Sequence, residues 1–133
     1  MSDKQFLELP YGKDDFPLLR EGNCYFVDKT PYLKTVFTDQ SAVMLFTRPR
    51  RFGKTLLISM FDSFLKINPE KPFDNSKQLE LFKGTKILED KEFCDKFMGQ
   101  CPVITITLKK VDGTNFKEFY ESFASAVYDV TLR

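Results

Sequence analysis

The chain has 133 residues, a length typical of one domain, and its 20 basic and 19 acidic residues leave a net charge of +1. This balance argues against a protein that coats nucleic acid or a membrane surface, although it is compatible with local charged patches. The chain has no histidine, which excludes catalytic Ser-His and Cys-His pairs, and its three cysteines show no zinc-ligand spacing. No signal-peptide pattern and no membrane-spanning stretch is apparent, so we expect a cytoplasmic protein that does not contact membranes.

The first part of the chain combines turn signals with one clear helix start. Proline and glycine residues punctuate residues 1–23, which predicts an N-terminal loop region. A short strand is expected at Cys24–Val27. A helix should follow, with Thr30 as its N-cap and Pro31 as its first residue.

The next stretch changes its hydrophobic period within a few residues. Ala42–Phe46 is a continuous apolar run, which is typical of a strand buried on both faces, as in a parallel sheet. From Thr55 the apolar residues follow helical spacing until Asn68-Pro69, which ends the predicted helix. A strand, a turn and a helix are therefore expected in succession.

The second half of the chain predicts further helices and one more strand. Two short helices are expected, at Asn75–Phe82 and Asp90–Phe97. Pro102–Leu108 is rich in β-branched residues and predicts a strand. From Phe116 onward the aromatic and apolar residues share one helical face, which is either part of the core or a partner-binding stripe.

Together these elements predict an α/β fold, a three-layer sandwich with a small, mostly parallel sheet flanked by helices. The fold is expected to be a single domain over residues 1–133, with its α/β core in residues 24–133. The last helix shows no stop signal, so we expect truncation at the C-terminus. Exposed edges of so small a sheet would favour a homo-oligomer.

The turn between the predicted strand and helix, residues 48–55, reads RPRRFGKT. The phosphate-loop pattern is G-x-x-x-x-G-K-[S/T]; Gly53-Lys54-Thr55 matches its end, whereas Arg48 occupies the place of the first glycine. The pattern is meaningful where it joins a buried strand to a helix, which is its predicted context here. The alternative is a solvent-exposed basic turn that closes a strand–helix corner.

The residues of a phosphate loop have defined roles. Gly53 would allow close backbone approach, Lys54 would reach the β- and γ-phosphates, and the Thr55 hydroxyl would ligate Mg²⁺. Backbone N–H groups of the loop and of the helix N-terminus would face phosphate oxygens, and arginines would add positive charge. The other candidate nucleotide-binding residues in the loop are therefore Arg48, Pro49, Arg50, Arg51 and Phe52.

Three blocks of the sequence resemble the AAA-ATPase-like family, whose longer members end in a predicted nuclease-type domain. The blocks are YFVDKTPYLKTVF, VMLFTRPRRFGKTLLISMFDSFL and CPVITITLKK, which together cover most of Tyr25–Lys110. The string RPRRFGKT is specific to that group, and Arg48 is its ordinary form there. The resemblance implies that the α/β sandwich is P-loop NTPase-like, and it implies ATP and Mg²⁺ as cofactors.

The VDKT block is a signature in the same family. Asp28 and Lys29 are therefore candidates to line the base or ribose of the nucleotide. The alternative is a structural role, in which Thr30 caps the following helix and Asp28 is stabilised near the helix N-terminus.

One part of a working ATPase does not appear in this sequence. ATP hydrolysis needs an acidic residue at the end of a second strand, to hold Mg²⁺ and orient water. The predicted strand Val103–Leu108 ends in Lys109-Lys110, and Asp112 lies beyond that basic pair. In the longer relatives this acidic strand lies further along, so the chain resembles the N-terminal part of an ATPase core and is not expected to hydrolyse ATP alone.

Two functions from different classes follow. The first is an ATP- and Mg²⁺-binding domain of an AAA-ATPase-like protein. The second is a stand-alone, non-catalytic binding protein, for example a mobile-element inhibitor, that grips RNA, DNA or a larger protein complex. Its contacts would come from the arginine-rich loop and Lys109-Lys110.

Overall fold

The structure is a computed structural model, and it describes residues 7–41, 43–50, 52–72, 74–109 and 111–131. The chain divides into two compact units, Met1–Pro102 and Val103–Arg133. No helix in the described ranges is both long and apolar enough to cross a membrane.

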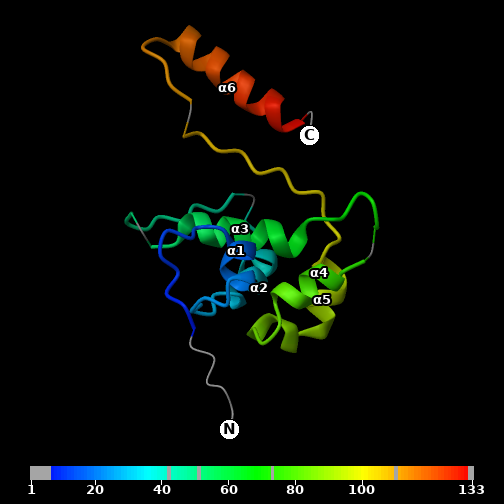
Figure 1. The fold of residues 1–133 in the computed structure, drawn as a ribbon. Coiled ribbons are helices and arrows are strands. Elements are labelled where there is room, and N and C mark those ends of the chain that lie inside the picture. The colour runs from blue at the N-terminus through cyan, green and yellow to red at the C-terminus, as the bar shows by residue number, and fades with distance from the viewer. Residues whose placement is uncertain (1–6, 42, 51, 73, 110, 132–133) are drawn as a thin grey trace. The chain divides into compact units, whose positions relative to one another are not determined.

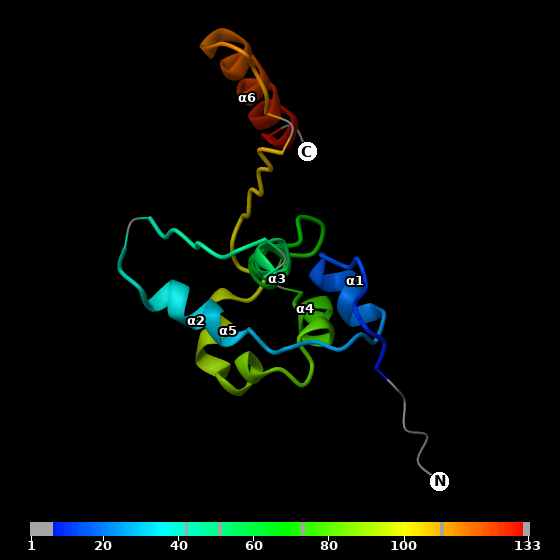
Figure 2. The same cartoon turned by 90° about the vertical axis from the view of Figure 1, so that its left-hand side faces the viewer.

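The first unit is helical over its described residues. Figure 1 shows α3 as a long central helix, and Figure 2 views it nearly end-on, with α1 on one side and α2 on the other. The elements of this unit are α1 (Phe16–Glu21), α2 (Pro31–Thr38), α3 (Lys54–Leu65), α4 (Ser76–Leu81), the 3₁₀ helix η1 (Lys86–Glu89) and α5 (Lys91–Phe97).

The predicted α/β sandwich with a mostly parallel sheet is wrong. Over the described residues the backbone pairs as β-structure only in two isolated parallel bridges, Glu8 with Cys24 and Lys66 with Cys101. Neither Val43–Phe46 nor Pro102–Leu108 forms a strand, and Ala42 lies outside the described residues.

The reason lies in the difference between an extended backbone and a paired one. Apolar and β-branched residues fit a pleated surface, but a strand exists only when a neighbour accepts its backbone hydrogen bonds. Val43 and Leu45 are 85% and 86% exposed, so the run that we expected to be buried on both faces is uncovered on the face that these two residues share.

The predicted helices are present, with shifted ends. The helix expected to begin at Thr55 is α3, and the two short helices of the middle region are α4 and α5. Helix α1 was missed because Pro17 was interpreted as a turn signal. Proline is favoured in the first turn of a helix, and Asp15 caps α1 by accepting a hydrogen bond from the Leu18 N–H at 3.1 Å.

Phenylalanine rings connect the elements of the first unit. Phe64 of α3 contacts Phe82, with ring centroids 5.2 Å apart, and Phe93 of α5, at 5.9 Å. Phe82 in turn packs on Phe16 of α1 at 4.7 Å. Phe16, Phe64 and Phe82 are completely buried. The high phenylalanine content of the chain therefore serves to join helices that share no sheet.

The second unit contains α6 (Phe116–Thr131). Its predicted apolar stripe is present in the sequence, but Phe116, Phe119 and Tyr120 are exposed. The two alternatives for this face, core or partner-binding stripe, both stay predictions.

Replacing Phe64 with alanine should destabilise the first unit strongly. Deleting a buried phenylalanine removes apolar contacts and leaves a cavity, at a cost of about 3–5 kcal/mol in the free energy of unfolding. Urea unfolding followed by circular dichroism measures this change. Ile58→Ala on the same helix is the matched control: Ile58 is 55% exposed, so its loss should cost less than about 1 kcal/mol. Equal losses for the two variants would contradict the assigned core.

Candidate functional site

The loop before α3 closes with a left-handed glycine. Gly53 is the N-cap of α3, with φ 75° and ψ 26°, a conformation that side chains rarely tolerate. A Cβ atom at this position would also lie 3.3 Å from Nζ of Lys29. The glycine predicted for the loop is thus required by its backbone conformation, and a side chain there would also displace the end of Lys29 slightly.

Two lysines hold the loop from different sides. The Lys54 ammonium donates hydrogen bonds to the carbonyl oxygens of Arg48 and Pro49, the second at 3.0 Å. Lys29 donates to the carbonyl oxygen of Phe52 at 3.5 Å. The structure therefore brings Lys29 of the VDKT block to the predicted phosphate loop, although Lys29 is not among the residues that line the cavity beside α3.

A cavity of about 820 Å³ lies beside the N-terminus of α3. One wall comes from the loop and the first turn of the helix and includes Arg50, Gly53, Lys54 and Thr55. The first helical hydrogen bond runs from the Leu57 N–H to the Gly53 carbonyl at 2.9 Å. The N–H groups that precede it belong to the unpaired first turn, where the helix dipole favours an anion.

The predicted residues differ in how they relate to this cavity. Four of them line it, whereas Arg48, Pro49 and Phe52 meet the lysine ammonium groups through their carbonyl oxygens. Arg51 lies outside the described residues. For Mg²⁺, the hydroxyl of Thr55 is the oxygen donor that the loop offers, and the described residues contain no group of three or more Cys, Asp or Glu side chains that could hold a metal.

The other part of the cavity lining was not predicted from the sequence. It is formed by residues 10–14, which belong to the predicted N-terminal loop region. The only signals there were the turn residues Pro10 and Gly12, which predict a turn but not its location. No local pattern could have shown that this turn lies against the start of α3.

Hydrogen bonds hold this turn in place on both sides. Before it, Glu8 accepts from the Tyr25 N–H at 2.8 Å. After it, the hydroxyl of Ser59 on α3 donates to the Asp15 carboxylate at 3.1 Å and accepts from the Phe16 N–H at 2.9 Å. Ser59 lies one helical turn after Thr55, so these bonds fix the turn over the face of α3 that begins at the cavity.

Within the turn, Lys13 is tethered as well. Its ammonium donates a hydrogen bond to the Cys24 sulfur at 3.1 Å, and this bond raises the pKa of Lys13 above its ordinary value.

Asp28 faces away from the loop and joins α2 to η1. Its Oδ1 accepts from the N–H and the hydroxyl of Thr30, at 2.9 and 2.7 Å, and its Oδ2 accepts from the Lys86 N–H at 2.8 Å. Thr30 is buried and its hydroxyl oxygen accepts from the Ile87 N–H at 3.2 Å. Thr30 is the N-cap of α2 and Pro31 its first residue, as predicted, although the Thr30 side chain makes no capping hydrogen bond.

These contacts decide the ionisation of Asp28. Burial alone would raise the pKa of this carboxyl group, because it disfavours the charged form. Hydrogen bonds from Thr30 and from the Lys86 N–H outweigh burial and bring the pKa below its ordinary value. The structural role of Asp28 is therefore supported, and no contact with the cavity accompanies it.

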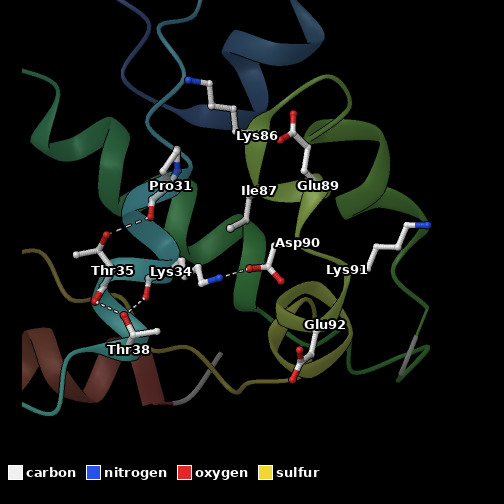
Figure 3. A pocket seen from close by; sticks show the side chains of 10 residues that line it. All are labelled: Pro31, Lys34, Thr35, Thr38, Lys86, Ile87, Glu89, Asp90, Lys91 and Glu92. Carbon is white, nitrogen blue, oxygen red and sulfur yellow. Dashed lines mark hydrogen bonds and ion pairs between the residues drawn. The ribbon is translucent and has the colours of Figure 1, made fainter.

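A second cavity, of about 850 Å³, lies between α2, η1 and α5 (Figure 3). Lys34 of α2 forms an ion pair with Asp90, the N-cap of α5, as the dashed line in Figure 3 shows. Their hydrogen bond raises the pKa of Lys34 and lowers that of Asp90, so each charge is already matched. This cavity carries no sequence motif, and we assign its charged pair to the packing of α2 against α5.

Asp28→Asn should destabilise the protein in a pH-dependent way. The side-chain amide would turn an N–H₂ group toward a backbone N–H group that now donates to the carboxylate. The lost hydrogen bond to a charged group corresponds to about 1.5–3 kcal/mol in the free energy of unfolding. A lowered folded-state pKa stabilises the fold above the ordinary pKa of Asp, near 3.9, and this stabilisation is lost as pH falls through the folded value. Urea unfolding should therefore separate wild type from variant at pH 7 and bring them closer below about pH 4. A pH-independent gap would contradict the assigned network.

Comparison with known proteins identifies the family of this sequence. The family model described as a predicted AAA-ATPase matches residues 10–131, a span that includes both walls of the cavity. No curated protein and no solved structure matches the chain. Because the match covers nearly the whole sequence, the chain belongs to the AAA-ATPase-like family.

Proposed function

We propose that the protein binds ATP with Mg²⁺ in the cavity at the N-terminus of α3. The observation that carries the proposal is the lining of this cavity. Four residues of the RPRRFGKT loop (residues 48–55, here called the GKT loop) line it together: Arg50, Gly53, Lys54 and Thr55. Membership in the AAA-ATPase-like family supports nucleotide as the ligand. The proposal concerns binding and does not extend to hydrolysis.

Lys54 is the residue that would respond most directly to the ligand. Its ammonium is held by the carbonyl oxygens of Arg48 and Pro49. A phosphate oxygen carries more negative charge than a carbonyl oxygen and forms a stronger, charge-assisted hydrogen bond. Bound phosphate would therefore draw the ammonium from these carbonyls into the cavity.

The remaining residues of this wall have complementary roles. The N–H groups at the start of α3 would donate to phosphate oxygens, and the arginine side chain of Arg50 would balance further negative charge. The hydroxyl of Thr55 would supply one ligand to Mg²⁺. When bound, the metal neutralises part of the charge on the β- and γ-phosphates. Lys29 would act indirectly, by fixing the Phe52 carbonyl and with it the path of the loop.

Lys54→Ala should weaken binding of ATP·Mg²⁺ by roughly tenfold or more, because a hydrogen bond to a charged group is worth about 1.5–3 kcal/mol. Isothermal titration calorimetry of wild type and variant measures this loss. Lys77→Ala is the matched control, since Lys77 is an exposed lysine on α4 that does not line this cavity. Thermal unfolding without ligand should show that both variants are folded.

Equal affinity of wild type and Lys54→Ala would contradict the proposal. So would the absence of ATP binding by folded wild-type protein. In that case the arginine-rich turn would serve another ligand, and RNA, DNA and acidic proteins would be the next to test.

A further inference from the structure

We propose that Tyr11 stacks on the base of the bound nucleotide, so that residues 10–14 form the base side of the site. This inference rests on the proposed function, and it deepens that function by assigning the wall of the cavity that the GKT loop does not supply. The carrying observation is that residues 10–14 line the same cavity as Arg50, Lys54 and Thr55.

Tyr11 lines this cavity, and its ring is accessible to a ligand. Its side chain is 97% exposed. The tight turn explains this placement: the Lys13 N–H donates to the Pro10 carbonyl at 3.4 Å, and Gly12 takes a left-handed φ of 70°. A flat aromatic ring held on a turn at a cavity can cover the face of a nucleobase.

The turn is held firmly enough to serve as a wall. The Tyr25 N–H bonds to Glu8 on one side of the turn, and Ser59 of α3 bonds to both Asp15 and Phe16 on the other. Tyr11 therefore lies within a few residues of two bonded positions, Glu8 before the turn and Asp15 after it. The backbone that carries Tyr11 therefore loses little conformational freedom when a ligand arrives, which favours binding.

The charges of the two walls orient the ligand. The loop before α3 contributes two cationic side chains to the lining, Arg50 and Lys54. The turn at residues 10–14 contributes Lys13 and Asp14, whose formal charges cancel. A triphosphate should therefore lie toward α3, which leaves the base toward the turn. The volume of about 820 Å³ is within the usual range of small-molecule sites and exceeds what a phosphate group alone would fill.

The test separates base recognition from phosphate recognition. Affinities for ATP·Mg²⁺ and for inorganic tripolyphosphate with Mg²⁺ are measured by calorimetry on the full chain, in wild type, Tyr11→Ala and Tyr11→Phe. Stacking of a base on an aromatic ring corresponds to roughly tenfold in affinity. Tyr11→Ala should therefore lose about tenfold for ATP and nothing for tripolyphosphate, and Tyr11→Phe should bind both as wild type does.

Tyr32→Ala is the matched control, because Tyr32 is another exposed tyrosine of the first unit that does not line the cavity. It should bind both ligands as wild type does. Wild-type affinity of Tyr11→Ala for ATP would overturn this inference and leave the proposed function intact. An equal loss for ATP and tripolyphosphate would also overturn it, because Tyr11 would then act on the phosphate side. Failure of wild type to bind either ligand would overturn the proposed function and this inference together.

Discussion

The burial of one face of α3 is the constraint on which the rest of the first unit depends. Phe64, near the end of this helix, is completely buried. It packs against the rings of Phe82, at the end of α4, and Phe93 of α5. That packing fixes the direction of α3 and therefore the position of its first turn, Gly53–Leu56. The cavity lies at that turn, so the aromatic core and the candidate site are two ends of a single rigid element.

Ser59 lies between these two ends and links them to the N-terminal segment. It bonds to Asp15 and to the Phe16 N–H, while the Phe16 ring itself enters the aromatic core. The turn at residues 10–14 is thus fixed by the same packing that fixes α3. Both walls of the cavity are consequences of one core, which explains how a unit without a described sheet can present a defined pocket.

All α-helices but α1 could be predicted from the sequence, whereas the predicted sheet was wrong. Apolar residues at helical spacing identify α3, α4 and α5 because a helix satisfies its own backbone hydrogen bonds. A strand depends on a partner elsewhere, and the exposed Val43 and Leu45 show that a β-like composition does not provide one. The prediction of a parallel sheet failed at that non-local step.

The site divides in a similar way. The GKT pattern singled out Gly53, Lys54 and Thr55, and the structure places all three at the start of α3 and in the lining of one cavity. The sequence could not separate the contacts of Asp28 and Lys29 within the VDKT block. In the structure Asp28 bonds to η1, whereas Lys29 bonds to the loop before α3. The turn that carries Tyr11 is brought to the cavity by tertiary contacts of Ser59, which no local pattern encodes.

The most direct test of this account is a titration of the ¹⁵N-labelled chain with ATP·Mg²⁺, followed through its backbone amide resonances. The account predicts the largest changes at Gly53–Leu56, smaller ones at residues 11–13, and none at Lys86–Asp90 beside the second cavity. Saturable changes confined to the α2–η1–α5 cavity, or no changes at the start of α3, would contradict the claim that this helix terminus holds the nucleotide phosphates.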